Sequence, residues 1–151
     1  MKILVDADAC PRAAKDILYS ATERLGLELL IVANQYIRTP PKPHIRNVVV
    51  GQGFNVADDK IEELTEAGDI VITADIPLAD RVVKKGGWAL CPRGELFDEE
   101  SIGSRLAVRD LMEELRSGGM VTGGPAAYSQ RDRSEFANAL NRLVDKLKKN
   151  S

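Results

Sequence analysis

Short apolar runs alternate with amphipathic segments through most of this chain, and that alternation limits the folds open to it. The predicted strands are Lys2–Asp6, Glu28–Ala33, Ile45–Val50, Asp69–Thr73 and Trp88–Cys91. Strands separated by helix-forming segments pair in parallel, because the intervening helix carries the chain back along the sheet. The sequence therefore predicts an α/β domain with a mostly parallel, five-stranded sheet.

Apolar residues at helical spacing fill most of the segments between these strands. Pro11 falls in the first turn of the first predicted helix, where its missing N–H costs nothing, and Gly26 ends that helix. Two further helices are expected over about Asp58–Ala67 and Pro77–Lys85. The link over 34–44 is different, because its three prolines exclude a helix from this parallel crossover.

Two longer amphipathic helices are predicted in the last third of the chain, over Ile102–Arg116 and Asp132–Lys149. Each carries one apolar stripe, so we expect both to pack against the sheet. The segment Gly118–Pro125 between them is either a flexible linker or a loop that closes over a ligand. We therefore expect a single domain over the whole chain, with a core over about 1–92 and a helical extension over about 93–151.

Composition excludes several classes of protein. The chain has 151 residues, of which 44% are hydrophobic and 29% charged, as in an ordinary globular domain. No apolar run approaches the roughly 20 residues that span a membrane, and Asp6 interrupts the N-terminal run too early for a signal peptide. Two cysteines are too few for a disulfide scaffold. A cytoplasmic location is the expectation, while the oligomeric state is not indicated.

Aspartates gather where the predicted strands end. Asp6 and Asp8 follow the first strand and Asp75 follows the fourth, although aspartate is disfavoured inside strands. Ligands of open parallel sheets bind beyond the carboxyl ends of the strands, near the point where strand order reverses. If the first and fourth strands are neighbours, these acids converge there. Asp58 and Asp59, at the start of a helix, reach the same edge.

Several carboxylates in one pocket repel one another unless a cation neutralises them. Oxygen ligands suit Mg²⁺ or Mn²⁺, ions that orient water and neutralise charge developing on a phosphodiester. The candidate metal ligands are Asp6, Asp8, Asp58, Asp59, Asp75 and Asp80.

Helix capping is the competing interpretation of these acids. Asp8, Asp58 and Asp75 each precede a predicted helix, where aspartate is a favoured N-cap. Asp80 lies within a helix, where a solvated position is the common outcome. Capping does not explain Asp6, and three acidic clusters predicted at one edge favour a metal site.

A basic stretch lies apart from the acids. From Leu29 through Ala57 there is no acidic residue, although the formal net charge of the chain is −2. An acidic site beside a basic stretch suits a polyanionic substrate held by metal. The candidate substrate contacts are Asn34, Gln35, Arg38, Lys42, Arg46, Thr73 and Arg93. Two alternatives stay open, namely loop capping by Asn34 and Gln35 and a salt bridge from Arg93 to a rim carboxylate.

The acidic pattern resembles a known superfamily. Asp6, then Asp58-Asp59-Lys60-Ile61, then Gly68–Asp75 are similar to the PIN-like metal-dependent nucleases, and the stretch to Gly87 is similar to their NYN branch. This resemblance covers about residues 1–92. It implies a three-layer sandwich, a divalent cation and catalytic roles for Asp6, Asp59 and Asp75. Pro77 departs from the pattern, since that branch often has an acid there, and Asp80 is the nearest substitute.

A second resemblance covers nearly the whole chain. The segments Asp6–Pro11, Val32–Gln35, Thr73–Ala79, Pro92–Gly94 and Gly123–Pro125 resemble the bacterial YaiI/YqxD family. This match implies fold more than substrate.

Three functions are therefore considered. The favoured one is a metal-dependent nuclease acting on RNA. The second is a non-catalytic RNA- or protein-binding module. The third is a phosphatase of the haloacid-dehalogenase type, because an Asp-x-Asp ends the first strand, although Ala9-Cys10-Pro11 follows where that class has threonine or valine.

Overall fold

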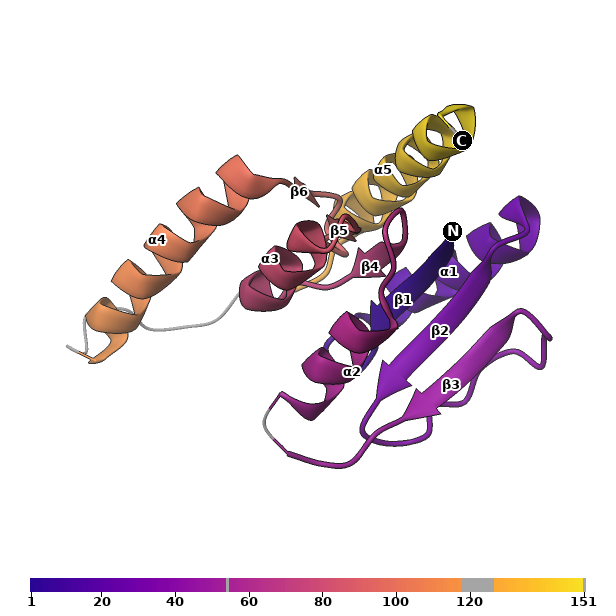
Figure 1. Cartoon of the computed structure of the whole chain (residues 1–151), viewed down its shortest axis with the longest axis horizontal. Helices are drawn as coiled ribbons and strands as arrows, with labels where there is room; N and C mark the ends of the chain where they lie inside the picture. The colour runs from indigo at the N-terminus through magenta and orange to yellow at the C-terminus, as the bar shows by residue number, and fades with distance from the viewer. Residues whose placement is uncertain (54, 118–126, 151) are drawn as a thin grey trace.

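A computed structural model describes residues 1–53, 55–117 and 127–150 (Figure 1). The strands are β1 (Lys2–Asp6), β2 (Glu28–Ala33), β3 (Ile45–Val49), β4 (Ile70–Ile72), β5 (Trp88–Leu90) and β6 (Leu96–Phe97). The helices are α1 (Arg12–Leu25), α2 (Val56–Leu64), α3 (Ile76–Lys84), α4 (Glu99–Ser117) and α5 (Gln130–Lys149). The α/β class and the alternation of strands and helices are confirmed.

The strands form one sheet in the order β3-β2-β1-β4-β5-β6. Strands β1 to β5 are parallel, and β6 adds an antiparallel edge strand that the sequence analysis missed, so the described sheet has six strands instead of five. Val5 pairs with Ile31 of β2 on one side and with Ile72 of β4 on the other. The expected adjacency of β1 and β4 is confirmed, and strand order reverses between them.

Helices cover both faces of the sheet, giving three layers. Ile3 and Val5 point into a core shared with α1 and α5, whereas Leu4 points into a second core shared with α2, α3 and the start of α4. Successive strand residues face opposite sides, so burial on both faces produces the continuous apolar runs seen in the sequence.

The two C-terminal helices differ in their packing. Phe136, Leu140 and Val144 bury α5 in the core beside α1, as expected. Helix α4 is anchored by Ile102 near its start and then projects away from the sheet (Figure 1). Its apolar stripe is exposed, at 54% for Val108, 55% for Leu111 and 38% for Met112, so the expectation that this helix packs on the sheet was wrong for most of its length. Gly118–Pro125 lies outside the described residues, so both interpretations of that segment stay predictions.

The link from β2 to β3 crosses without a helix, as its prolines predict. The amide of Ile37 donates to Asn47 Oδ1 of β3 at 3.3 Å. Lys42 forms an ion pair of 3.2 Å with Glu23 near the end of α1. These contacts hold the link against the domain at two points.

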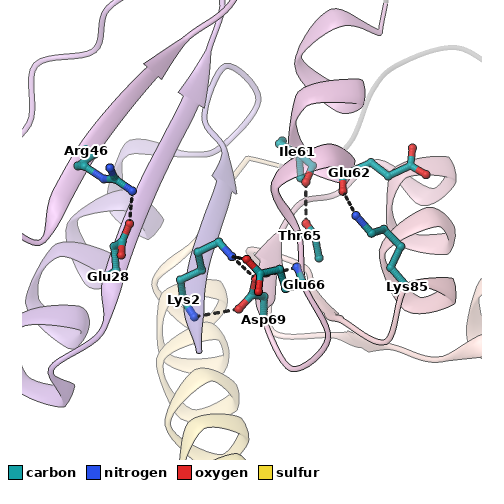
Figure 2. Close-up of polar contacts among 9 residues, drawn as sticks. All are labelled: Lys2, Glu28, Arg46, Ile61, Glu62, Thr65, Glu66, Asp69 and Lys85. Atoms are coloured by element: carbon teal, nitrogen blue, oxygen red, sulfur yellow. Dashed lines mark hydrogen bonds and ion pairs between the residues drawn. The ribbon is translucent and has the colours of Figure 1, made fainter.

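The amino-terminal edge of the sheet is closed by matched charges. The backbone N–H of Lys2 donates to Asp69 Oδ1 at 3.1 Å, and the Lys2 ammonium pairs with the same carboxylate (Figure 2). The backbone N–H of Glu66 donates to Asp69 Oδ2 at 2.8 Å, so this buried acid is fully partnered. The pair joins the starts of β1 and β4.

Within the described ranges, no helix is long and apolar enough to cross a membrane.

Candidate functional site

Thr73 joins two aspartates at the carboxyl edge of the sheet. It follows β4 and is buried, and its hydroxyl donates to Asp6 Oδ2 at 3.2 Å. The same hydroxyl accepts from the backbone N–H of Asp75 at 3.0 Å. Because β1 and β4 are parallel neighbours, the acid that ends one strand and the acid that follows the other lie beside a single side chain. The substrate contact that the sequence analysis assigned to Thr73 stays a prediction, and the structure adds that its hydroxyl bonds to both Asp6 and the backbone of Asp75.

Asp75 also caps a helix. It is the N-cap of α3, and its Oδ1 accepts from the backbone N–H of Leu78 at 2.9 Å. The capping interpretation is therefore confirmed for Asp75. Capping engages one carboxylate oxygen and the positive end of the helix dipole, and it fixes the orientation of the carboxylate toward the edge of the sheet.

Asp8 and Asp58 do not cap helices. Helix α1 has Pro11 as its N-cap without a side-chain bond, and Asp8 Oδ2 instead accepts from the backbone N–H of Asn34 at 2.8 Å, which joins the ends of β1 and β2. Asp58 lies in the first turn of α2, whose N-cap is Asn55. The capping interpretation was wrong for both, because each helix begins at a different residue from the one expected.

Burial and mutual repulsion act on these acids, which we call the carboxylate rim (Asp6, Asp8, Asp58 and Asp75). The pKa of Asp6 is raised to about 6, mainly by burial and next by the neighbouring Asp58, with smaller contributions from Asp75 and Asp8. The Thr73 hydrogen bond acts in the opposite direction. Burial, followed by Asp75, also raises the pKa of Asp58. The four carboxylates thus share one electrostatic environment.

Asp59 and Asp80 are already paired with cations. Asp59 Oδ1 accepts from Arg81 at 2.6 Å, and Arg81 also pairs with Glu62. Asp80 pairs with Lys84 at 2.8 Å along α3. Their predicted roles as metal ligands, and the catalytic role of Asp59, stay predictions. The geometry favours Asp58 over Asp59 as the acid that α2 contributes.

The carboxylate rim supplies the oxygen donors that a hard divalent cation prefers. Within residues 1–53, 55–117 and 127–150, however, no three His, Cys, Asp or Glu side chains are placed so that they could hold one ion. The donor chemistry fits a divalent cation, while the side chains stand apart from one another. Mutual repulsion holds like-charged side chains apart, and a bound divalent cation draws them together.

A cysteine side chain is buried beside this site. Cys10 is buried in the turn before α1, and burial raises its pKa to about 12. A thiol in that state is protonated near neutral pH, so it is not the nucleophile that cysteine chemistry requires.

Two of the predicted cationic contacts lie at the opposite edge of the sheet. Arg46, near the start of β3, pairs with Glu28 at the start of β2 (Figure 2), and Lys42 pairs with Glu23. Their roles as substrate contacts stay predictions, but their pairing and position favour structural roles.

Arg93 follows β5 and reaches toward α5. It pairs with Asp132 at 2.8 Å, and its guanidinium lies 5.8 Å from the centre of the Tyr128 ring. Arg93 therefore forms a salt bridge, but with Asp132 of the α5 capping box, which is not one of the rim carboxylates that the sequence analysis considered as its partner. The structure places this contact between the sheet edge and the last helix.

The remaining predicted contacts lie on the link after β2. Asn34 and Gln35 are exposed at the carboxyl edge, and Arg38 lines a groove against α1. Arg12 and Lys15 line the same groove, and the sequence analysis missed them because charged residues in an amphipathic helix usually form its solvated face. The signal that points to them is their place directly after the acidic turn, which brings the start of α1 to this edge.

Comparison with known proteins gives a consistent family. A family model described as "Uncharacterized BCR, YaiI/YqxD family" matches residues 4–146. A UPF0178 protein of Thioalkalivibrio sulfidiphilus is 55% identical over 146 residues, covering 97% of this chain and 99% of the relative. A UPF0178 protein of Colwellia psychrerythraea is 52% identical over 149 residues, covering 99% of both chains. No solved structure matches the chain. The chain belongs to the YaiI/YqxD family.

Proposed function

We propose that the protein is a metal-dependent nuclease that acts on RNA, with the carboxylate rim as its metal site. The observation that carries this proposal is the convergence of carboxylates at the carboxyl edge of the sheet, where Thr73 bonds to Asp6 and to the backbone of Asp75. In agreement with this, burial and three neighbouring acids raise the pKa of Asp6 to about 6. Holding these charges together costs folding free energy. A divalent cation would remove that cost, and a phosphodiester is a substrate that such a cation activates. The sequence resemblance to PIN-like nucleases supports the same assignment.

The protein's own residues have separate roles in this proposal. Asp6, Asp58 and Asp75 would hold the cation, which when bound supplies charge neutralisation at the phosphate and activation of water. Thr73 positions Asp6 and Asp75 through its two hydrogen bonds. Asp8, which is exposed, fixes the start of the β2–β3 link through Asn34.

A second candidate is a non-catalytic RNA-binding module with the same fold. The observation that favours it is the separation of the acids, since no three of the described acidic, histidine or cysteine side chains form a closed ligand set. Pro77, which stands where nucleases of the NYN branch often have an acid, favours the same candidate.

Asp75 decides between these candidates, because asparagine keeps its cap but loses its charge. The Asp75→Asn variant should retain its melting temperature without metal, since asparagine is as good an N-cap as aspartate. Its Mn²⁺- or Mg²⁺-dependent cleavage of RNA should fall by orders of magnitude, because metal sites supply much of the transition-state stabilisation. Asp145→Asn on the exposed face of α5 is the control and should cleave like the wild type.

The same assay also distinguishes the results that would contradict the nuclease proposal. A folded Asp75→Asn protein that cleaves RNA at the wild-type rate would remove Asp75 from the site. A wild-type protein that binds RNA but cleaves neither RNA nor DNA with either metal would favour the binding module. Hydrolysis of a phosphomonoester alone would favour the phosphatase.

A further inference from the structure

A groove of about 570 Å³ runs between α1 and the β2–β3 link. One wall is the first half of α1, with Arg12, Lys15, Asp16 and Tyr19, and the other is the segment 37–41. Three of the lining side chains are cationic, namely Arg12 and Lys15 on the first wall and Arg38 on the second. One lining side chain, Asp16, is acidic. The formal net charge of the chain is −2, so a positive groove does not follow from overall composition.

The three cations of this groove are available to an anionic ligand. Within the described residues, neither Arg12 nor Lys15 nor Arg38 forms an ion pair with a carboxylate. By contrast, Lys42 and Arg46 of the same basic stretch are both paired with glutamates. The basic stretch therefore divides into a paired part at the amino-terminal edge and an unpaired part that lines the groove.

The two walls of the groove are tied together close to the carboxylate rim. The backbone N–H of Asn34, three residues before the wall residue Ile37, donates to Asp8 of the rim, four residues before the wall residue Arg12. The link is also held at Ile37 by Asn47 and, farther along, at Lys42 by Glu23. The walls are thus fixed before any ligand binds, which lowers the entropic cost of binding.

An exposed aromatic side chain lies in the same link, directly before the groove wall. Tyr36 is 70% exposed, and it lies between Asn34 at the rim and Ile37 in the groove wall. Single-stranded nucleic acids are held by a cationic track for the phosphates together with aromatic side chains on which unpaired bases stack. A duplex keeps its bases stacked on each other and gains nothing from Tyr36.

We propose that the groove lined by Arg12, Lys15 and Arg38 binds the phosphates of a single-stranded nucleic acid, with a base stacked on Tyr36, and leads that strand to the carboxylate rim. The binding part stands on the groove alone. Only the fate of the strand at the rim rests on the proposed nuclease function.

Two charge-matched variants test the track. Lys15→Gln/Arg38→Gln and Lys42→Gln/Arg46→Gln each remove one lysine and one arginine, the first pair from the groove and the second from the opposite edge. Binding of a labelled oligouridylate of about 12 nucleotides is measured by fluorescence anisotropy in EDTA over a series of salt concentrations. The groove variant should bind roughly tenfold more weakly, with a slope of log affinity against log salt that is smaller by about 1.4. The other variant should keep the wild-type affinity and slope.

Tyr36 is tested with two further variants. Tyr36→Ala should weaken binding without changing the salt slope, because stacking releases no counterions, and Tyr36→Phe should restore it. The wild type should bind a duplex of the same length more weakly than the single strand. Equal effects of the two charge-matched variants on oligonucleotide binding would overturn the assignment of the groove as the phosphate-binding surface. Equal binding of duplex and single strand would overturn the assignment of Tyr36 as a base-stacking residue.

A separate measurement keeps this inference distinguishable from the nuclease proposal. Wild-type protein with Mn²⁺ is offered a small activated phosphodiester that cannot extend into the groove. No hydrolysis, together with the expected binding results, would overturn the nuclease and leave the groove assignment standing. Hydrolysis together with unchanged oligonucleotide binding by the groove variant would overturn the groove assignment alone.

Discussion

Thr73 and Asp6 face each other across β4 and β1, with the Thr73 hydroxyl 3.2 Å from Asp6 Oδ2. The Thr73 hydroxyl oxygen also accepts from the backbone N–H of Asp75. One buried hydroxyl therefore links both strand ends of the carboxylate rim and partly offsets the repulsion that Asp6 experiences.

Thr73→Val removes this hydroxyl while keeping the branched shape of the side chain. We expect a loss of about 1–3 kcal/mol in unfolding free energy, because the Asp75 N–H loses its partner. The loss should be larger at about pH 8 than at about pH 5, since the lost bond lowers the pKa of Asp6 and is strongest to the ionised acid. Urea unfolding at both pH values measures this, with Thr73→Ser as the conservative control. An equal loss at both pH values would show that the hydroxyl does not act on Asp6.

Asp6→Asn should stabilise the metal-free protein in a pH-dependent way. The folded-state pKa of Asp6 is about 6 against an ordinary 3.8, so the unfolded chain releases this proton first as pH rises. The stability penalty is absent below about pH 4, grows between about pH 4 and 6, and is complete above that range. The variant should therefore gain up to about 3 kcal/mol at neutral pH and little at pH 4. Denaturant unfolding of the variant and the wild type across this range checks the prediction.

Divalent cations should raise the melting temperature through the carboxylate rim. Binding to the folded state alone stabilises it by mass action, so millimolar Mn²⁺ or Mg²⁺ should raise the melting temperature of the wild type. Asp6→Asn/Asp75→Asn should abolish that rise. Asp59→Asn/Asp80→Asn removes the same number of charges from acids that are already paired, and it should keep the rise. The reverse pattern would transfer the metal site to the surfaces of α2 and α3.

Gly94 is expected to tolerate no side chain. Its φ is +97°, and an added Cβ would lie 2.8 Å from the backbone carbon and oxygen of Glu135 in α5. Gly94→Ala should lower the unfolding free energy by about 2 kcal/mol or more. Gly103→Ala, in α4 with nothing within 4 Å of the added atom, should instead raise it by about 0.5–1 kcal/mol. Thermal unfolding of the two alanine variants is the comparison, and a neutral Gly94→Ala would show that the turn after β5 can shift away from α5.

Elements with a complete local pattern were predictable from the sequence. The strand residues Lys2–Asp6 and Glu28–Ala33 have the predicted bounds, because burial on both faces leaves an unbroken apolar run. Strand β6 was missed, since two residues carry no period and pair only because the turn at Gly94 folds back. The stripe of Val108, Leu111 and Met112 was detected as helical, but periodicity does not state whether a partner surface lies within reach.

The candidate site was predictable in part for the same reason. Asp6 and Asp75 converge because parallel strands end at a common edge, a property of topology that the order of elements already implies. The separation of Lys42 and Arg46 from Arg38 depends on how the β2–β3 link returns to the other edge. The path of the β2–β3 link depends on tertiary contacts between distant residues, which local sequence patterns do not specify. The same is true of the ion pair between Asp59 of α2 and Arg81 of α3.

The two edges of the sheet would respond in opposite ways to evolution in the laboratory. At the amino-terminal edge, the charge of Asp69 is matched by Lys2, so selection for heat resistance alone would retain it. At the carboxyl edge, neutral replacements of Asp6 relieve repulsion, so the same selection would discard this acid early. A library selected only for thermal stability should therefore accumulate neutral replacements in the carboxylate rim, while Lys2 and Asp69 at the opposite edge are retained. A library selected for activity should retain the acids of the rim.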